Sequence, residues 1–304
     1  MMTGKEILKK FGIYMENEPV SIYPFSPVYR IDDVVVKRTQ KRPQPLVGYT
    51  TYLYKEGINV VIPVQLEMDN PQTIGNETFV VYPFITGKVY AGKDHEVYEA
   101  GKLLGKIHHL SPEENVFQLG EYDVYDFTID DVVESVENIE KHAKQNNFEL
   151  NAELLQERLT HIVSRQEELQ RASLPMVMTP HDYKANNLIY TPDPYLIDPD
   201  NAVCIPRIFD LALALLLFHN EMETARDQVF TPKQLELFLK GYKEYVSLSA
   251  LELRYWERAI EHVFLDEVMW LMAEVEEDWE SDSQRKLFAS LLALLEDKSA
   301  YRLG

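Results

Sequence analysis

The chain has 304 residues, 45% of them apolar, which predicts a globular protein of about two domains or lobes. Its formal net charge of −20 argues against a nucleic-acid partner and fits a cationic small molecule, a bound Mg²⁺ or simple solubility. One cysteine excludes an internal disulfide or a cysteine-built zinc site, and the lack of a signal peptide or a long apolar run predicts a cytoplasmic protein without a membrane span.

The first eighty residues alternate short strand patterns with helical ones. Thr3 and Glu6 form the capping-box pattern of a helix over residues 3–14. Asp32 and Asp33 separate two β-rich segments and predict a hairpin turn. The expected strands cover residues 21–23, 27–31, 34–39, 58–65 and 77–82, with a helix over residues 45–56 that ends at Gly57. This spacing predicts an antiparallel meander.

The pattern changes after the last of these strands. Pro83 cannot donate to a strand ladder and Gly87 permits a change of direction, so we place a lobe boundary after residue 84. The expected helices cover residues 97–110, 132–145, 152–172, 211–218, a segment capped by Thr231, 250–279 and 282–297. We therefore predict an α+β, two-lobed fold, in which residues 1–84 form a small antiparallel β-rich N-lobe and residues 85–304 a large, mainly helical C-lobe.

One acidic stretch, residues 179–201, carries the side chains most suited to catalysis. Two short apolar segments flank a Pro-Asp-Pro turn at residues 192–194, which predicts a strand–turn–strand element. This geometry brings Asn187 beside Asp198, with Asp182 close by. Two oxygen donors next to a free carboxylate suit a divalent cation and the base of a phosphate transfer.

Three further residues extend this predicted centre. Asp200 follows Asp198 by two positions and is a candidate ligand for a second metal or a water. Lys184 can neutralise charge on a transferring phosphoryl group. Lys37 ends an apolar strand triplet, where it either reaches nucleotide phosphates or is an ordinary exposed lysine. Loops rich in Asp and Asn are commonly plain turns, but the combined pattern favours a catalytic centre.

Three motifs stand out together in the second half of the chain: HDYKANN at residues 181–187, LIDPD at residues 196–200 and RIFDLA at residues 207–212. With these motifs the chain resembles the aminoglycoside phosphotransferase and choline-kinase-like family, small-molecule kinases with a protein-kinase-like fold. Residues 101–110 are similar to the helix that follows the hinge in that family. The resemblance implies an ATP- and Mg²⁺-dependent phosphotransferase, with GTP not excluded as the donor.

The resemblance also implies roles for the motif residues. Asp182 corresponds to the catalytic base, with Lys184 beside it, and Asn187 and Asp198 correspond to the Mg²⁺ ligands. Lys37 corresponds to the strand lysine that holds the α- and β-phosphates.

A second group of residues is implied to bind the nucleotide base or to support the loop. The backbone of four residues corresponds to the hinge: Tyr82, Pro83, Phe84 and Ile85. Ile189 and Ile197 correspond to the apolar floor under the base. Asp210 corresponds to a buried support of the catalytic loop, unless it is the N-cap of the next helix. His181 is expected to share this support.

The small lobe departs from the family pattern in two ways. The phosphate loop corresponds to residues 23–27, which contain no glycine and only Ser26 as a small polar residue. The helix over residues 45–56 carries its single acid, Glu56, at its end, so we expect Tyr49 or Tyr52 to orient the lysine. These departures favour, as the alternative function, a catalytically weak or inactive kinase-fold protein that binds a ligand or serves a structural role.

The expected acceptor is the hydroxyl group of a small molecule, either an aminoglycoside-like antibiotic or a metabolite alcohol. Residues 198–210 leave little room for the peptide-docking segment of a protein kinase, which makes an atypical protein kinase the third hypothesis. Residues 266–282 contain eight acidic residues and no Lys or Arg, so they form either a pocket for an amine or a solvated helix face. The candidate acceptor contacts are Asp266, Trp270 and Glu274.

Overall fold

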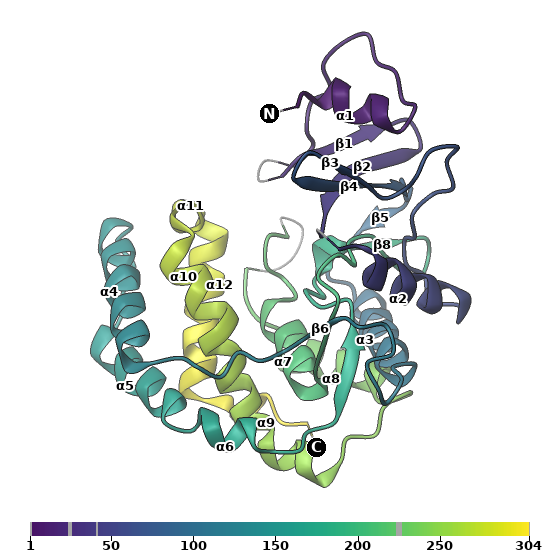
Figure 1. The fold of residues 1–304 in the computed structure, drawn as a ribbon. Coiled ribbons are helices and arrows are strands. Elements are labelled where there is room, and N and C mark those ends of the chain that lie inside the picture. Colours follow the sequence, from purple (N-terminus) through teal and green to yellow (C-terminus); the bar gives the residue numbers. More distant parts are fainter. Residues whose placement is uncertain (1, 24–25, 41, 223–226, 304) are drawn as a thin grey trace.

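The computed structural model describes residues 2–23, 26–40, 42–222 and 227–303 (Figure 1). A small antiparallel sheet with one short helix lies at one end of the molecule, and a larger body made mostly of helices lies at the other. This is the α+β, two-lobed fold expected from the sequence. In the described part of the chain, no helix is both long and apolar enough to cross a membrane.

The small sheet has four antiparallel strands in the order β1-β2-β4-β3. They are β1 Val28–Ile31, β2 Val34–Thr39, β3 Gln72–Ile74 and β4 Glu77–Pro83. The hairpin turn is where Asp32 and Asp33 predict it, and Asp32 has a φ of 49°, a left-handed conformation that Asp tolerates. Helix α1, Gly4–Lys10, carries the predicted capping box and packs its apolar residues against Val36 and Phe79. Because side chains alternate along a strand, Lys37 points to the opposite face.

Helix α2, Gln44–Lys55, packs its apolar face on the larger lobe. Tyr49 and Leu53 are fully buried in the same apolar cluster as the helices of that lobe. The Tyr49 hydroxyl donates a hydrogen bond to the Met178 carbonyl oxygen at 2.8 Å. The helix ends as predicted before Gly57, whose φ of 84° is readily adopted by glycine.

The strand predicted over residues 58–65 is wrong. Ile58, Val60 and Val61 are buried, but the segment makes only a single parallel bridge, between Val60 and Leu196. Pro63 lacks an N–H group, so a longer ladder cannot form across it. Burial alone therefore accounts for the apolar pattern.

The larger lobe consists of helices around one extended apolar core. They are α3 Asp94–His109, α4 Ile129–Gln145, α5 Ala152–Val163, α6 Gln166–Gln170, α7 Arg207–Leu217, α8 Pro232–Tyr242, α9 Ala250–Val263, the π-helical turn η2 Phe264–Val268, α10 Met269–Glu274, α11 Glu276–Glu280, α12 Asp282–Glu296 and the 3₁₀ turn η3 Lys298–Ala300. Helices α3 and α8 touch through glycine, since a Cβ on Gly101 would lie 2.0 Å from the Phe238 carbonyl oxygen.

Two predicted helices are divided in the structure. The segment over residues 152–172 breaks after Val163, where the Arg165 N–H group turns back to the Ile162 carbonyl oxygen. The segment over residues 250–279 passes through the π-helical turn and leaves the helical conformation at Val275, which has φ −98° and ψ 83°. Both interruptions keep apolar residues facing the core, so the apolar spacing does not reveal them.

Two small sheets in the larger lobe hold the predicted catalytic loop. One contains β5 Lys88–Val89, β8 Leu188–Tyr190 and β9 Pro194–Leu196 in the order β5-β8-β9; the other contains β6 Gly120–Glu121, β7 Met176–Thr179 and β10 Val203–Pro206 in the order β6-β10-β7. Strands β8 and β9 form the predicted strand–turn–strand element, although β9 begins two residues earlier than expected. The loop between β7 and β8 includes the 3₁₀ turn η1 Ala185–Asn187.

Candidate active site

The hydrogen bonds of the loop after β7 bring three predicted residues together. The Ile197 N–H group donates to the Asn187 carbonyl oxygen at 3.0 Å, so Asp198 follows directly beyond this pairing. The Asn187 side-chain NH₂ group donates to the Asp182 carbonyl oxygen at 2.9 Å and lies 3.5 Å from its carboxylate. Because the NH₂ group is bound to the loop, the Asn187 amide oxygen remains as the group that can face a ligand.

Asp182 has the properties of a proton acceptor. Its φ is 44° and that of His181 is 55°, two consecutive left-handed residues that are neither glycine nor asparagine. Asp and His adopt this conformation more readily than most residues, but two in succession are unusual, and sparsely populated backbone conformations cluster at functional sites. Burial raises the pKa of the Asp182 carboxyl, Lys184 opposes the rise, and Asp198 adds to it. A raised pKa makes a carboxylate a stronger base.

Lys184 lies between two carboxylates. Its ammonium group is 3.3 Å from Asp182 Oδ2 and 2.9 Å from Glu221 Oε2. Asn186 also donates to Glu221, at 3.3 Å. Burial alone would lower the pKa of Lys184, but the two carboxylates outweigh it and keep the group charged. Glu221 is not predictable from the sequence, because no periodic or motif signal links an acid after α7 to the loop.

Lys37 reaches this site from the small sheet. Its ammonium group is 2.6 Å from Asp198 Oδ1 and 3.3 Å from Asp200 Oδ2. The prediction that Tyr49 or Tyr52 orients Lys37 is wrong: the Tyr49 hydroxyl donates to the Met178 carbonyl and the Tyr52 hydroxyl to the Leu110 carbonyl. Burial alone would lower the pKa of Lys37, but the two aspartates raise it above its usual value.

Asp210 is a buried hydrogen-bond centre beneath the loop. It accepts from His108 Nε2 at 2.8 Å, from the Thr179 hydroxyl at 3.0 Å and from His181 Nδ1 at 3.2 Å. Burial alone would raise the pKa of Asp210, yet the bonds from both histidines hold it well below the usual range. The N-cap alternative for Asp210 is wrong, because Pro206 occupies that position.

His181 connects this centre to the π-helical turn. Its Nε2 atom lies 3.5 Å from Glu267 Oε1, while Nδ1 faces Asp210. Burial alone would lower its pKa, but the two carboxylates raise the pKa of His181 to about 10. It therefore stands beside the candidate base as an imidazolium. The sequence analysis assigned no role to His108, Thr179 or Glu267, since only the fold brings them to this loop.

Replacing His181 with Asn should change how stability depends on pH. The raised pKa means that the charged His181 stabilises the fold fully below its ordinary pKa of 6.5 and loses this effect as the pH rises toward about 10. Asn tolerates a positive φ, so the change removes the charge without new strain. The difference in Tm between the protein and the H181N variant should be large at pH 6 and smaller at pH 9. The exposed His95, replaced in the same way, is the control, and an equal difference at both pH values would contradict the expectation.

A small apolar cluster lies between the small sheet and β9. Val61, Val80 and Tyr82 are buried there, with Ile85, Tyr195 and Ile197 packed against them. Ile189 is the cross-strand partner of Tyr195, which puts it on the same face of the hairpin. This arrangement brings together the apolar residues that the sequence assigned to a nucleotide base.

The expected hinge segment spans the end of strand β4 and, in the part of the chain that the structure describes, leaves the backbone N–H group of Ile85 open. Pro83 has no N–H group, and the Phe84 N–H group donates to the Asp33 carbonyl oxygen at 2.7 Å. The Arg30 guanidinium lies 3.5 Å above the centre of the Phe84 ring. Among the described residues, the Ile85 N–H group has no hydrogen-bond acceptor.

The expected phosphate loop is only partly described, since Pro24 and Phe25 fall outside the described residues. Residues 21–23 are not the predicted strand but part of a turn around the Ser21 hydroxyl. That hydroxyl accepts the Val28 N–H group at 3.0 Å and lies 3.2 Å from the carbonyl oxygen of Ser26. Ser21 is thus the residue that organises this turn.

The oxygen donors at the site fit a hard divalent cation. Asn187 offers an amide oxygen, the Asp198 side chain is 41% exposed, and buried Asp200 Oδ2 faces the Lys37 ammonium group at 3.3 Å. No group of three or more His, Cys, Asp or Glu gathers into a complete metal cluster within the described ranges. Mg²⁺ in proteins commonly takes one or two carboxylates and completes its shell with phosphates and waters, which this donor set permits.

The acidic segment over residues 266–282, which holds the candidate acceptor contacts, has some side chains at the surface and others in the core. The Asp266 carboxylate accepts the Tyr122 hydroxyl at 2.8 Å, and burial raises the pKa of Asp266 to about 6. Trp270 is 55% exposed and Glu274 is exposed. Trp279 is fully buried, with its indole N–H group donating to the Met272 carbonyl oxygen, so it belongs to the core.

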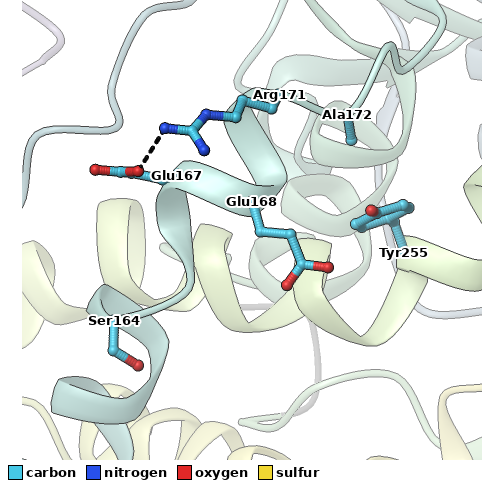
Figure 2. A pocket seen from close by; sticks show the side chains of 6 residues that line it. All are labelled: Ser164, Glu167, Glu168, Arg171, Ala172 and Tyr255. Atoms are coloured by element: carbon cyan, nitrogen blue, oxygen red, sulfur yellow. Dashed lines mark hydrogen bonds and ion pairs between the residues drawn. The ribbon is translucent and has the colours of Figure 1, made fainter.

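An open depression elsewhere on the larger lobe contains none of the predicted site residues. Figure 2 shows its lining, which consists of Ser164, Glu167, Glu168, Arg171, Ala172 and Tyr255. It occupies ≈ 400 Å³ beside α6 and α9. Arg171 and Glu167, an exposed pair one helical turn apart, lie 2.8 Å from one another. This depression carries no base, lysine and metal-donor set like that around Asp182.

Several known proteins share this fold. A spectinomycin phosphotransferase solved with ADP and spectinomycin is 16% identical with a TM-score of 0.59, over 97% of each chain. An amicoumacin kinase solved with AMP-PNP and Ca²⁺ is 16% identical with a TM-score of 0.61, over 97% of this chain and 93% of the other. The choline kinase LicA from Streptococcus pneumoniae is 16% identical with a TM-score of 0.58, over 96% and 98%. At this identity the likeness shows the fold alone.

Sequence comparison adds the family. None of the curated protein sequences compared with this chain matches it significantly. The model of the phosphotransferase enzyme family, APH, matches residues 28–254. This match confirms the resemblance carried by the motifs around Asp182, Asp198 and Asp210. The match covers well over half of the sequence, and the chain therefore belongs to the phosphotransferase enzyme family.

Proposed function

We propose that this phosphotransferase moves the γ-phosphate of ATP, with Mg²⁺, to a hydroxyl group of a small molecule. One observation supports the proposal most. Asp182, Asn187 and Asp198 share one site in the larger lobe, and Lys37 reaches it from the small sheet to within 2.6 Å of Asp198. A base, two oxygen donors and an opposing lysine are the parts that positioned phosphoryl transfer requires.

Each side chain has a task in this proposal. Asp182 accepts the proton of the attacking hydroxyl, helped by a pKa that burial raises. Lys184 and Lys37 offer positive charge to the phosphates. Asn187 and Asp198 would hold Mg²⁺, which supplies charge neutralisation at the β- and γ-phosphates. Asp210 and the His181 imidazolium hold the loop that carries the base.

We assign the nucleotide base to the apolar cluster between the lobes. Ile85 and Ile197 pack there, and the Ile85 N–H group supplies a donor for a base edge. The relatives solved with ADP and with AMP-PNP and Ca²⁺ support a nucleotide with a divalent cation. ATP and GTP both fit these requirements. The lobe boundary after residue 84 and the phosphate contact of Ser26 are part of the same proposal.

The proposed acceptor is a small alcohol that carries an amine. Carboxylates surround the site, among them Glu221 next to Lys184 and Glu267 next to His181, and they favour a cation. Asp266, Trp270 and Glu274 remain the proposed contacts of the acceptor. The relatives named for spectinomycin and choline support this class. Strand β10 and helix α7 follow Asp200 at once, so a docking segment for a protein substrate has little room.

A nucleotide-consumption screen tests the function. The purified full-length protein is mixed with ATP or GTP, Mg²⁺ and a panel of aminoglycosides, amino alcohols, macrolides and sugars. We expect one class to raise consumption above the acceptor-free rate and a chelator of divalent cations to abolish the increase. Tight binding of Mg²⁺ and ATP without turnover of any panel member would favour the catalytically inactive alternative.

A further inference from the structure

We infer that Asp200 replaces the helix glutamate that kinases use to position the phosphate-binding lysine. In this inference Asp200 is a positioning residue for Lys37 and leaves Asp198 as the carboxylate that binds the metal. The inference rests on the proposed function. It revises the sequence-based expectation that Asp200 is itself a metal ligand.

Helix α2 supplies no partner for the lysine. In protein kinases the lysine of the third strand pairs with a glutamate on the following helix. Here the helix over Gln44–Lys55 contains no acidic residue, and Glu56, directly after it, is exposed. The hydroxyl groups of Tyr49 and Tyr52 on α2 donate hydrogen bonds to carbonyl oxygens of the larger lobe and do not reach Lys37. Lys37 therefore takes its partners from elsewhere.

The surroundings of Asp200 fix its carboxylate in one orientation. The residue is only 8% exposed. The Tyr82 hydroxyl donates to Oδ1 at 2.9 Å, and the Gln40 side-chain NH₂ group donates to the Asp200 carbonyl oxygen. With Oδ1 held by Tyr82, the Oδ2 atom faces the Lys37 ammonium group at 3.3 Å. Oδ2 has no hydrogen-bond partner in the described structure, so the ion pair is its compensation for burial.

Asp198 is more exposed than Asp200 and its orientation is less constrained. Its side chain is 41% exposed, against 11% for that of Asp200, and no tyrosine holds it. It also contacts Lys37, at 2.6 Å, so one ammonium group faces two carboxylates. The pair carries one negative charge more than the lysine neutralises. Asp198 can turn toward a divalent cation while Lys37 keeps Asp200, but Asp200 Oδ2, the oxygen that Tyr82 does not hold, could bind a cation only by competing with Lys37 for the same atom.

The arrangement also ties the lobes together at the site. Lys37, Gln40 and Tyr82 belong to the small sheet or its edge, and all three contact Asp200 of the larger lobe. A glutamate on α2 would hold the lysine from its own lobe. Here the segment that carries Asp198 also holds the lysine, so one short segment positions both the phosphate contact and the metal donor.

Measuring ADP binding without a metal ion distinguishes the role of Asp200 from that of Asp198. Contact between Lys37 and the phosphates needs no cation, so calorimetry in a chelator of divalent cations reports on the lysine without the contribution of the metal. We expect the Asp200→Asn variant to bind ADP about tenfold or more weakly, the effect of losing a charge-assisted partner. Asp198→Asn should change this affinity less than threefold but raise the Mg²⁺ concentration needed for ADP binding about tenfold. Tyr82→Phe should weaken metal-free binding by about threefold to tenfold, since it loosens Asp200 without removing its charge.

The outcomes distinguish this inference from the proposed function. If the wild-type protein binds ADP and the D200N variant binds it equally well without metal but needs more Mg²⁺, Asp200 is a metal ligand and the inference is wrong. If the wild-type protein binds no nucleotide, the proposed function itself fails. Where D200N does not fold, as judged by its Tm, the Y82F variant decides: unchanged metal-free affinity would overturn the inference.

Discussion

Replacing Asp182 with Asn should lower kcat by about 10²–10⁴-fold, the range that a positioned general base contributes. The nucleotide KM should change little, because the substitution leaves the apolar cluster around Ile85 and Ile197 intact. The loop should also keep its shape. Asn187 bonds to the carbonyl oxygen of residue 182, which the variant retains, and Lys184 keeps Glu221 at 2.9 Å. Steady-state kinetics with the acceptor found by the screen provides the measurement.

Asp193 offers the matched control for this variant. It is an exposed aspartate in the turn of the neighbouring hairpin, so Asp193→Asn removes one carboxylate near the site without touching the proposed chemistry. We expect its kcat to stay within about twofold of the wild-type value. A D182N variant that retained turnover at a similar level would show that Asp182 is not the base.

The sequence predicts the fold where local chemistry decides it. The caps at Thr3 and Thr231 begin helices as expected, because caps satisfy backbone groups within one turn. The hairpin at Asp32 is equally local. The strand prediction over residues 58–65 was wrong because a tertiary contact decides the structure there. These residues pack beside β9 and form no strand ladder of their own.

In the site too, local structure is predictable from the sequence and tertiary contacts are not. The spacing of Asp182, Asn187 and Asp198 is set by one hairpin, so the sequence alone brought them together. Glu221 and Glu267 lie near the loop only because α7 and the π-helical turn pack beside it. Acids on distant helices carry no periodic signal that distinguishes an active-site contact from a solvated face. The same limit hid the bond between Tyr82 and Asp200, which joins residues 118 positions apart and underlies the positioning role that we infer for Asp200.

Replacing Asp210 with Ala should destabilise the protein by about 3–5 kcal/mol, the cost of removing one partner from a buried charged network. The carboxylate is 1% exposed and accepts from His108, Thr179 and His181. Its loss leaves the His108 Nε2 group, whose side chain is fully buried, without an acceptor. The midpoint of urea unfolding at pH 7 provides the measurement, with the exposed Asp123, replaced by Ala, as the control.

The pH dependence of this variant separates the charge of Asp210 from its packing. The depressed pKa of Asp210 means that its charge stabilises the fold above its ordinary pKa of 3.8 and that this effect is lost as the pH falls below that value. The difference in unfolding free energy between the wild-type protein and the D210A variant should therefore shrink in acid. A difference that stayed constant down to pH 3 would show that the loss comes from the cavity left by the side chain. Activity provides an independent measurement. His181 connects Asp210 to the left-handed backbone at His181 and Asp182, so loss of the Asp210 carboxylate should let the candidate base move and should lower kcat even where the variant remains folded.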